Sequence, residues 1–444
     1  MRALFPSIKK YWIYLVLFVF SVVIFLIHYS IAGQAVYGDG IDYWAYLHTW
    51  YFDHDMDFTN EYEHIYNHEF NNAHPESKSP VIVKTNVTKL GKTDDIHPYG
   101  TALFFLPFFM IADGIVVIAN LFHIGLLRNG YSDTYQIIVG MGSIIYTFLG
   151  LVIMEYTCVK LGVGEKIARL STLTLFGAST LLYYGSFDVI NSHGISLFLL
   201  SVFWYLLFIR ASYSIRRFAA YGVLMGLAFV VRLQEALLAV PLTLVSVRAL
   251  WPNFPKLVKL CVVTGIVGLL VVFPLFYQWH VLYGGWLHSS YFDGFAPTPL
   301  VGSLFDAQNG LFTKTPLIFL IVMVTPIVAL CAKKYRFLMG VFSLFFVLQV
   351  VLLARHGGWI GAAYGGRMYI NCTFAFVLIF ALLLERSQKG ISYRLLRYFC
   401  VFFIVYNMMS IGDFVLFEKM ASGNKIGSES ITKVKIERLL HFQY

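Results

Sequence analysis

Long apolar runs recur along the whole chain, and short polar or basic breaks separate them. Several runs approach the roughly 20 residues that a helix needs to cross the hydrocarbon core of a bilayer. We therefore expect an all-α integral membrane protein with about 11 transmembrane helices, within a range of about 10 to 13. The predicted spans are 11–33, 135–158, 168–184, 194–209, 218–232, 235–248, 260–277, 316–332, 337–354, 368–385 and 398–414.

Composition supports this class. The chain is 58% hydrophobic and 13% charged, whereas an ordinary soluble domain has roughly 25% charged residues. The net charge of +9 comes from basic clusters between apolar runs, a pattern typical of topology signals, so we predict no nucleic-acid partner. The five cysteines lie in or beside apolar segments without a zinc-binding spacing, and we interpret them as small core residues.

The charge distribution also predicts an orientation. With the N-terminus inside, the cytoplasmic connections hold more than half of the 33 lysines and arginines, while all but three of the 24 acidic residues lie outside or at outer helix ends. The segment 100–124 is the exception, because it is apolar but contains Pro107 and Asp113. As a full span it would move Lys160 and Lys166 outside, so we expect interfacial or re-entrant helices there.

This topology divides the chain into two parts. Residues 1–414 form the polytopic transmembrane domain, in which 34–134 is a long extracytoplasmic first loop with interfacial or re-entrant helices. Residues 415–444 form an extracytoplasmic tail with a weak helical pattern. Most of the unusual polar residues then gather on the extracytoplasmic side.

The first loop is dense in carboxylates. Alternation in Asp53, Asp55 and Asp57 favours a solvated acidic loop over a metal site. A divalent metal would suit these carboxylates, but the sequence forces no ligand set, so no metal ligand is predicted and the cofactor stays open. Asp39 differs, because it lies between two glycines where a span ends and an aromatic helix begins. Partial shielding from water would raise its basicity and suit it to act as a general base.

The sequence resembles the GT-C superfamily of membrane glycosyltransferases, with the closest likeness to bacterial relatives of protein O-mannosyltransferases and of the lipid A aminoarabinose transferase. The first loop matches D-G-x-x-Y-[YW]-x-Y-L from Asp39 to Leu47 and D-x-D-x-D-F-x-N-E-Y from Asp53 to Tyr62. The likeness continues, in the family's order, in HPYGTALFFLPFF (97–109), NSHGISLF (191–198), GLAFVVRLQEALL (226–238), FPLFYQWHVLYGGW (273–286), NGLFTKTPL (309–317) and HGGWIGAAYGGR (356–367).

The resemblance implies an inverting transfer at the extracytoplasmic face, from a polyprenyl-phosphate-linked sugar to a hydroxyl or amine of a protein, glycan or lipid acceptor. It gives the role of base to Asp39, with Asp42 second. Better-known members have Asp-Glu at this point, whereas this chain has Asp39-Gly40, which leaves open whether a second carboxylate helps. The predicted substrate contacts are Tyr43, Glu61, His97, His193, Arg232, Gln278, Tyr283 and Arg367. The resemblance favours the bacterial inner membrane as the location, with an endoplasmic reticulum membrane as the lesser alternative.

Two arginines are the candidates for stabilising a departing lipid phosphate. Arg232 interrupts an apolar stretch, where a charge is costly enough to suggest function; the alternatives are a pair with Glu235 or an arginine snorkelling at a helix end. Arg367 follows a glycine-rich outer turn, where the alternative is an interface anchor. For His193, a helix cap or a hydrogen-bonded polar residue is slightly favoured over a substrate contact.

Two rival classes fit parts of the pattern. A transporter or flippase of a lipid-linked sugar would also have many spans, but it predicts polar groups near the midplane and symmetric halves, and no internal repeat is visible. A non-catalytic transferase homologue would look much like an active one. The absence of a Walker-type phosphate loop argues against nucleotide hydrolysis by this chain.

Overall fold

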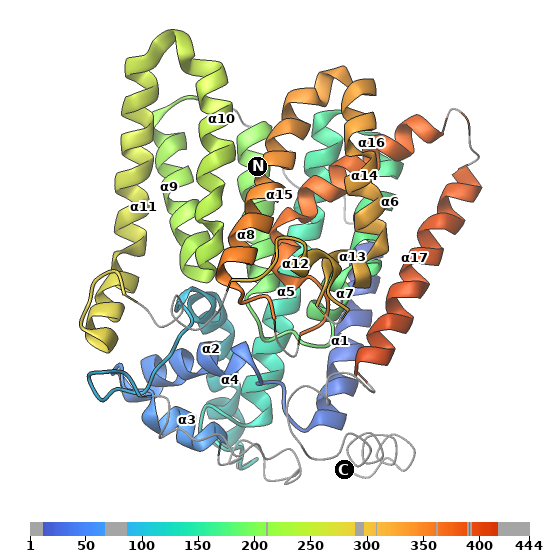
Figure 1. The fold of residues 1–444 in the computed structure, drawn as a ribbon. Helices are drawn as coiled ribbons and strands as arrows, with labels where there is room; N and C mark the ends of the chain where they lie inside the picture. The colour runs from blue at the N-terminus through green and yellow to red at the C-terminus, as the bar shows by residue number, and fades with distance from the viewer. Residues whose placement is uncertain are drawn as a thin grey trace.

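The computed structural model describes residues 12–66, 87–209, 212–288, 297–307, 309–360, 363–388, 390 and 393–415. Within these residues the regular structure is helical, and the single β pairing is an isolated bridge between Val87 and Thr93. The predicted all-α class is therefore confirmed for the described chain (Figure 1). The predicted tail beyond Val415 lies outside these residues.

The bundle consists of long helices with shorter ones at their ends. The longer helices are α1 (Trp12–Ala32), α4 (Gly100–Leu121), α5 (Asp133–Leu161), α6 (Glu165–Gly177), α8 (His193–Phe208), α9 (Ile215–Val231), α10 (Ala239–Leu250), α11 (Phe254–Tyr283), α14 (Pro316–Cys331), α15 (Arg336–His356), α16 (Thr373–Ser387) and α17 (Tyr393–Asp413). The shorter elements are α2 (Asp39–His48), η2 (Thr49–Asp53), α3 (Thr59–Tyr66), α7 (Thr180–Tyr184), η5 (Leu233–Leu238), η6 (Trp251–Asn253), α12 (Gly302–Phe305), α13 (Leu311–Lys314), η8 (Lys333–Tyr335) and η9 (Arg367–Cys372).

Among the described residues, seven helical stretches are long and apolar enough to cross a membrane. One of them, Leu233–Tyr283, contains both α10 and α11, which pack against each other and are joined at the top of Figure 1. The helices α8 and α14 are apolar but shorter. The structure thus agrees with an integral membrane protein, whereas the predicted count of about eleven spans is not confirmed.

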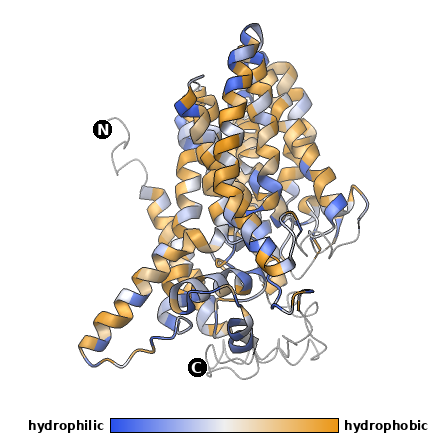
Figure 2. Ribbon diagram, turned by 90° about the vertical axis from the view of Figure 1, so that its left-hand side faces the viewer, coloured by the Kyte–Doolittle hydropathy of each residue, from blue (hydrophilic) through white to orange (hydrophobic). Residues whose placement is uncertain are grey.

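The outer surface of the bundle is apolar. On α11, Ile266, Leu269 and Leu270 are 55%, 61% and 69% exposed. Figure 2 shows hydrophobic residues along most of the bundle and hydrophilic ones concentrated toward its two ends. Contiguous apolar surface of this extent is unfavourable in water but matches the hydrocarbon core of a bilayer.

For the segment 100–124, the sequence predicts interfacial or re-entrant helices. The structure shows the single helix α4 over Gly100–Leu121, which is among the seven candidate spans by length and composition, and its placement relative to a membrane stays a prediction. Its contacts follow the first half of α5, from the Phe104 carbonyl, which accepts from the Tyr146 hydroxyl at 3.1 Å, to Asp113, which accepts from Tyr135 at 2.6 Å. In apolar surroundings a broken helix would leave backbone groups without partners, so the helix tolerates Pro107.

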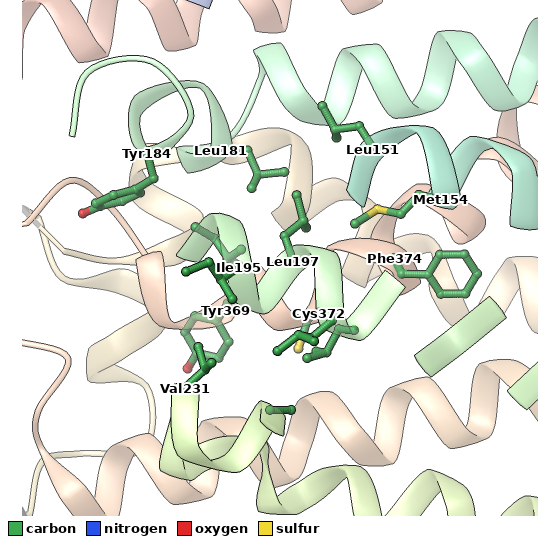
Figure 3. Packing of buried hydrophobic residues seen from close by; sticks show 14 of the residues in the cluster. Leu151, Met154, Leu181, Tyr184, Ile195, Leu197, Val231, Tyr369, Cys372 and Phe374 are labelled. Atoms are coloured by element: carbon green, nitrogen blue, oxygen red, sulfur yellow. The ribbon is translucent and has the colours of Figure 1, made fainter. Parts of the chain in front are cut away.

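The core lies where α5, α8, α9 and η9 meet. Figure 3 shows Leu151 and Met154 of α5 near Leu197 of α8, with Val231 of α9 and Tyr369 of η9 nearby. All five side chains are at most 2% exposed. This packing fixes the start of α8, the end of α9 and the start of η9, the three places where His193, Arg232 and Arg367 lie.

Gly100 allows α4 to begin directly against the end of α9. A Cβ atom there would lie 2.3 Å from the backbone carbon and oxygen of Val230, whereas a Cβ at Gly114 of the same helix would meet nothing within 4 Å. We expect Gly100→Ala to destabilise the protein by about 1–3 kcal/mol, because the α9 backbone must move. Gly114→Ala is the matched control, and a melting temperature equally unchanged in both variants would contradict the close contact.

The two ends of the bundle differ in charge. At one end, which we call the basic end, the α5–α6 turn meets the α14–α15 turn: Lys334 Nζ donates to the Leu161 carbonyl at 3.2 Å, and Glu385 accepts from the Gly164 amide. Lys160, Lys166 and Lys333 lie in the same turns. The opposite end, the loop end, carries α2, η2 and α3 (Figure 1).

Candidate functional site

The helix α2 places Asp39 at the loop end of the bundle. Gly38 precedes it with φ of +55°, a left-handed conformation that glycine adopts without strain, and Asp39 is the first helical residue. The rest of the helix is fixed by burial, and Trp44 Nε1 donates to the Gly130 carbonyl at 3.0 Å. Asp39 is therefore held at the start of a packed helix rather than in a solvated loop.

Asp39 forms an ion pair with Arg367. The distance between Asp39 Oδ2 and an Arg367 terminal nitrogen is 2.9 Å, and the two side chains are 29% and 17% exposed. Arg367 is the first residue of η9, and the Nε of its guanidinium is buried without a hydrogen-bond partner. One N–H donor of Arg367 thus stays available for another acceptor beside Asp39.

Arg232 directly follows the last residue of α9, and its side chain is buried. Its terminal nitrogens donate to His193 Nδ1 and Gln234 Oε1, and the residue is 7% exposed. The proposed partner Glu235 instead accepts from Ser196 Oγ at 2.8 Å and from Asn371 at 3.2 Å. Arg232 therefore does not pair with Glu235, and its buried side chain does not extend to the surface as a snorkelling arginine would.

The Arg232 contact defines the protonation of His193. An arginine only donates hydrogen bonds, so Nδ1 of His193 accepts and the neutral ring carries its proton on Nε2. That Nε2 is buried without a hydrogen-bond partner. The backbone amide of His193 donates to Asn191 Oδ1 at 2.8 Å, so Asn191, and not the His193 ring, binds this amide at the start of α8.

His97 and Asp42 form a hydrogen-bonded pair next to Asp39. His97 Nδ1 lies 2.5 Å from Asp42 Oδ2, and the other Asp42 oxygen accepts from the Tyr62 hydroxyl at 2.8 Å. Burial alone would lower the pKa of His97, but the charge and hydrogen bond of Asp42, assisted by Asp39, raise it above its ordinary value. The edge of Tyr43 packs on the same ring, with centroids 5.4 Å apart.

These groups surround one cavity of about 280 Å³. Of the predicted site residues, it is lined by Asp39, Tyr43, His97, His193, Arg232 and Arg367, and Asp42 is tied to it through His97. The cavity lies at the loop end, between the start of α2, the start of α8, the end of α9, and η9. With Asp188 and His356, which also line the cavity, segments separated by more than 300 residues supply two carboxylates, two guanidinium groups and three imidazoles to a single site.

The pKa of Asp39 differs from the expectation. Burial would raise it, but Arg367, His97 and Arg232 together lower it below the ordinary value for an aspartate. The predicted increase in basicity is wrong, because nearby positive charge outweighs the desolvation of the carboxylate. Asp39 is consequently ionised at neutral pH and has a reduced affinity for protons.

The structure does not bring Glu61, Gln278 and Tyr283 to this cavity. Glu61 contacts His48 at 3.0 Å, and Tyr283 donates to Asp94 at 2.7 Å. Gln278 donates to the Tyr46 hydroxyl and lines a separate pocket of about 80 Å³. Their prediction as substrate contacts gains no support from the geometry.

Several lining residues were not singled out from the sequence. Tyr37, Asp188, Ser192, His356 and Met368 also line the cavity. His356 begins the glycine-rich block 356–367, and Ser192 lies beside His193, so both were within recognised blocks. For Tyr37 and Met368, no chemical signal in the sequence distinguishes them from other apolar or aromatic residues near helix ends.

The chain matches no protein-family model, no curated protein and no solved structure. Its function is therefore argued from the chemistry of this cavity and from the sequence patterns that led to it.

Proposed function

We propose that the protein is a membrane glycosyltransferase that moves a sugar from a polyprenyl-phosphate-linked donor to an acceptor. The observation that carries the proposal is that one cavity contains both hydrogen-bond donors without acceptors and a carboxylate. Two buried N–H donors without acceptors, Arg367 Nε and His193 Nε2, lie in residues that also surround the ionised Asp39. Donors without partners favour a bound anion, and the carboxylate favours a group that releases a proton.

The lipid phosphate would occupy the side of the cavity formed by Arg232, His193 and Arg367. Charge-assisted hydrogen bonds from arginine suit phosphate oxygens, and they strengthen as negative charge develops on the leaving group. The apolar outer faces of the neighbouring helices would hold the prenyl chain. A donor that is lipid-linked needs no soluble nucleotide-sugar domain.

The acceptor would enter on the side of Asp39. In the transfer step, the acceptor oxygen or nitrogen bonds to the anomeric carbon while the bond from that carbon to the phosphate oxygen breaks. The acceptor proton passes to Asp39, and the polyprenyl phosphate leaves with the electron pair. Attack opposite the leaving group inverts the anomeric configuration.

The charge asymmetry of the bundle supports an orientation for this reaction. Basic turns gather at the basic end, and the positive-inside rule favours a cytoplasmic location for them. The cavity at the loop end would then face the extracytoplasmic side. A bacterial inner membrane fits this arrangement and the family resemblance.

The pH dependence distinguishes two proton acceptors. If Asp39 accepts the proton, its lowered pKa predicts that kcat/KM stays level down to about pH 5, because the carboxylate remains ionised there. If neutral His97 is the base, its raised pKa places the acid limb above about pH 6.5. We expect the first profile; a fall in kcat/KM beginning near pH 7 would assign the role to the His97–Asp42 pair.

Transfer is tested with the detergent-solubilised protein, a panel of labelled polyprenyl-phosphate sugars and a host extract as acceptor source. Release of free polyprenyl phosphate with sugar incorporation is the expected result. A flippase needs a sealed bilayer and leaves the sugar on its lipid, so movement of intact donor across proteoliposomes without release would replace the proposal. Release that is independent of the extract would indicate hydrolysis instead of transfer.

A further inference from the structure

A second group of ionisable side chains lies away from the cavity, where α2, η2 and α3 meet. His48 ends α2, Asp53 ends η2 and Glu61 lies in α3. His48 Nδ1 is 3.1 Å from Asp53 Oδ2 and 3.0 Å from Glu61 Oε1, and the three atoms all lie within 4.8 Å of one another. One nitrogen and two carboxylate oxygens therefore converge on one point.

The backbone brings these residues together independently of their mutual contacts. The π-helical turn of η2 is followed by His54 in a left-handed conformation, and the His54 amide donates to the Thr49 carbonyl at 2.6 Å. Asp55 accepts from the Thr49 hydroxyl at 2.8 Å, and Asp57 accepts from the Thr59 amide at 3.1 Å. In the DHDMD segment, Asp55 and Asp57 thus stabilise the turn, whereas Asp53 points to His48 and Glu61.

The ring of His48 is also oriented by packing. It stacks on Tyr131 with centroids 4.4 Å apart and an interplanar angle of 18°, and it contacts Phe52 with centroids 5.1 Å apart. Aromatic packing of this kind limits rotation of the imidazole. Nδ1 is therefore held toward the two carboxylates.

Asp53 Oδ2 accepts from Asn60 Nδ2 at 3.0 Å, whereas among the described residues Glu61 has no such donor besides the His48 ring. Glu61 is 0% exposed, and its Oε2 is buried without a hydrogen-bond partner. Nδ1 carries at most one proton, so it cannot donate fully to both Asp53 and Glu61. A buried carboxylate oxygen without a partner is costly, and a cation between the three side chains would remove that cost.

We propose that His48, Asp53 and Glu61 bind a divalent transition-metal ion such as Zn²⁺ or Mn²⁺. For metal–ligand bonds of about 2.0–2.2 Å, ligand atoms are separated by about 3 Å at near right angles and by about 3.4 Å in the tetrahedral geometry of zinc. The distances of 3.1 and 3.0 Å from His48 Nδ1 therefore match an octahedral ion and are slightly short for zinc. A nitrogen with two carboxylate oxygens suits zinc and manganese better than Mg²⁺ or Ca²⁺, which prefer oxygen ligands.

The position of the ion indicates a structural role. His48 and Asp39 lie at opposite ends of the ten-residue helix α2, so their Cα atoms are about 13 Å apart at 1.5 Å per residue. The ion would fasten α2, η2 and α3 to one another. Tyr62 follows Glu61 directly and donates to Asp42. The bound ion would therefore also help to position the Asp42–His97 pair.

The test measures metal binding by the purified full-length protein after treatment with a chelator. Equilibrium dialysis against Zn²⁺, Mn²⁺ and Mg²⁺ should give about one equivalent of Zn²⁺ or Mn²⁺ in the wild type and a melting temperature that rises with metal. His48→Ala and Asp53→Asn should each weaken binding at least tenfold. Bound Co²⁺ should give visible absorption in the wild type that these variants lose.

Glu63→Gln is the matched control, because Glu63 is an exposed carboxylate on the same short helix. Binding unchanged in Glu63→Gln but lost in Glu61→Gln supports the site, and folding is checked by the melting temperature without metal. Uptake by the wild type no greater than by Asp53→Asn, or a preference for Mg²⁺ over Zn²⁺ and Mn²⁺, would overturn the proposal. Neither outcome depends on sugar transfer.

Discussion

Replacing Asp39 with asparagine is expected to lower the rate of sugar transfer by about 10²- to 10⁴-fold, the range that a positioned acid or base contributes. Asparagine keeps the shape of the side chain but cannot accept the acceptor proton. Arg367 would lose the ion pair measured at 2.9 Å, yet α2 stays packed through Trp44, which is fully buried. The rate is measured as released polyprenyl phosphate at equal amounts of folded protein.

Glu63→Gln is again the control, since it removes a carboxylate from the first loop without touching the cavity. A normal melting temperature with lost turnover in Asp39→Asn would separate chemistry from folding. Turnover within a factor of two of the wild type would remove Asp39 from the proton transfer. Asp42→Asn would then become the decisive variant, because Asp42 holds the His97 ring.

Removing either cavity arginine is the second large effect. We expect Arg232→Gln and Arg367→Gln each to lower kcat/KM for the donor by about 10- to 150-fold, because a hydrogen bond to a charged group contributes roughly 1.5–3 kcal/mol. Arg216→Gln is the matched control. It removes a cation from the first turn of α9, about 24 Å from Arg232 at 1.5 Å per residue.

The two arginine variants should differ in their pH profiles. Arg367 contributes the largest of the influences that lower the pKa of Asp39, ahead of Arg232. In Arg367→Gln the pKa of Asp39 rises, so Asp39 is protonated and activity is lost at a higher pH than in the wild type. An unchanged donor affinity in both variants, or an equal loss in Arg216→Gln, would contradict a phosphate subsite between the two arginines.

The sequence was informative where a charged residue interrupts an apolar segment, because burying a charge there is costly. Arg232 follows the apolar end of α9, and burial of such a residue requires a partner or a ligand. That argument selected Arg232, whereas Arg367 was selected because it follows a glycine-rich turn, and both line the cavity. The identity of the partner was not predictable, because His193 lies 39 positions away from Arg232 and meets it only through the packing of α8 against α9.

In the segment 100–124, by contrast, the sequence did not predict the continuity of the helix. Asp113 suggested a break in the sequence, but its carboxylate accepts from Arg128 at 2.9 Å and also from Tyr51 and Tyr135. These partners come from three other segments, so no local pattern reveals them. Once the carboxylate is satisfied, an uninterrupted helix leaves the fewest backbone groups without hydrogen bonds.

Tertiary contacts likewise decided which aromatic and polar residues reach the cavity. Tyr43 and Tyr46 lie on the same short helix, but Tyr43 lines the cavity whereas Tyr46 lines the smaller pocket with Gln278. The segment containing Asp94 lies against Tyr283 and binds its hydroxyl. Helical spacing predicts which side chains share a face, but it does not predict which neighbour covers that face.

The most direct test of the donor site is an experimental structure of the protein with a polyprenyl monophosphate, determined in a lipid nanodisc. The account predicts phosphate density within hydrogen-bond distance of Arg232 or Arg367, the prenyl chain leaving along apolar helix faces, and Asp39 facing the opposite side of the cavity. A phosphate bound elsewhere, with the cavity containing Asp39 and both arginines left without lipid, would contradict it.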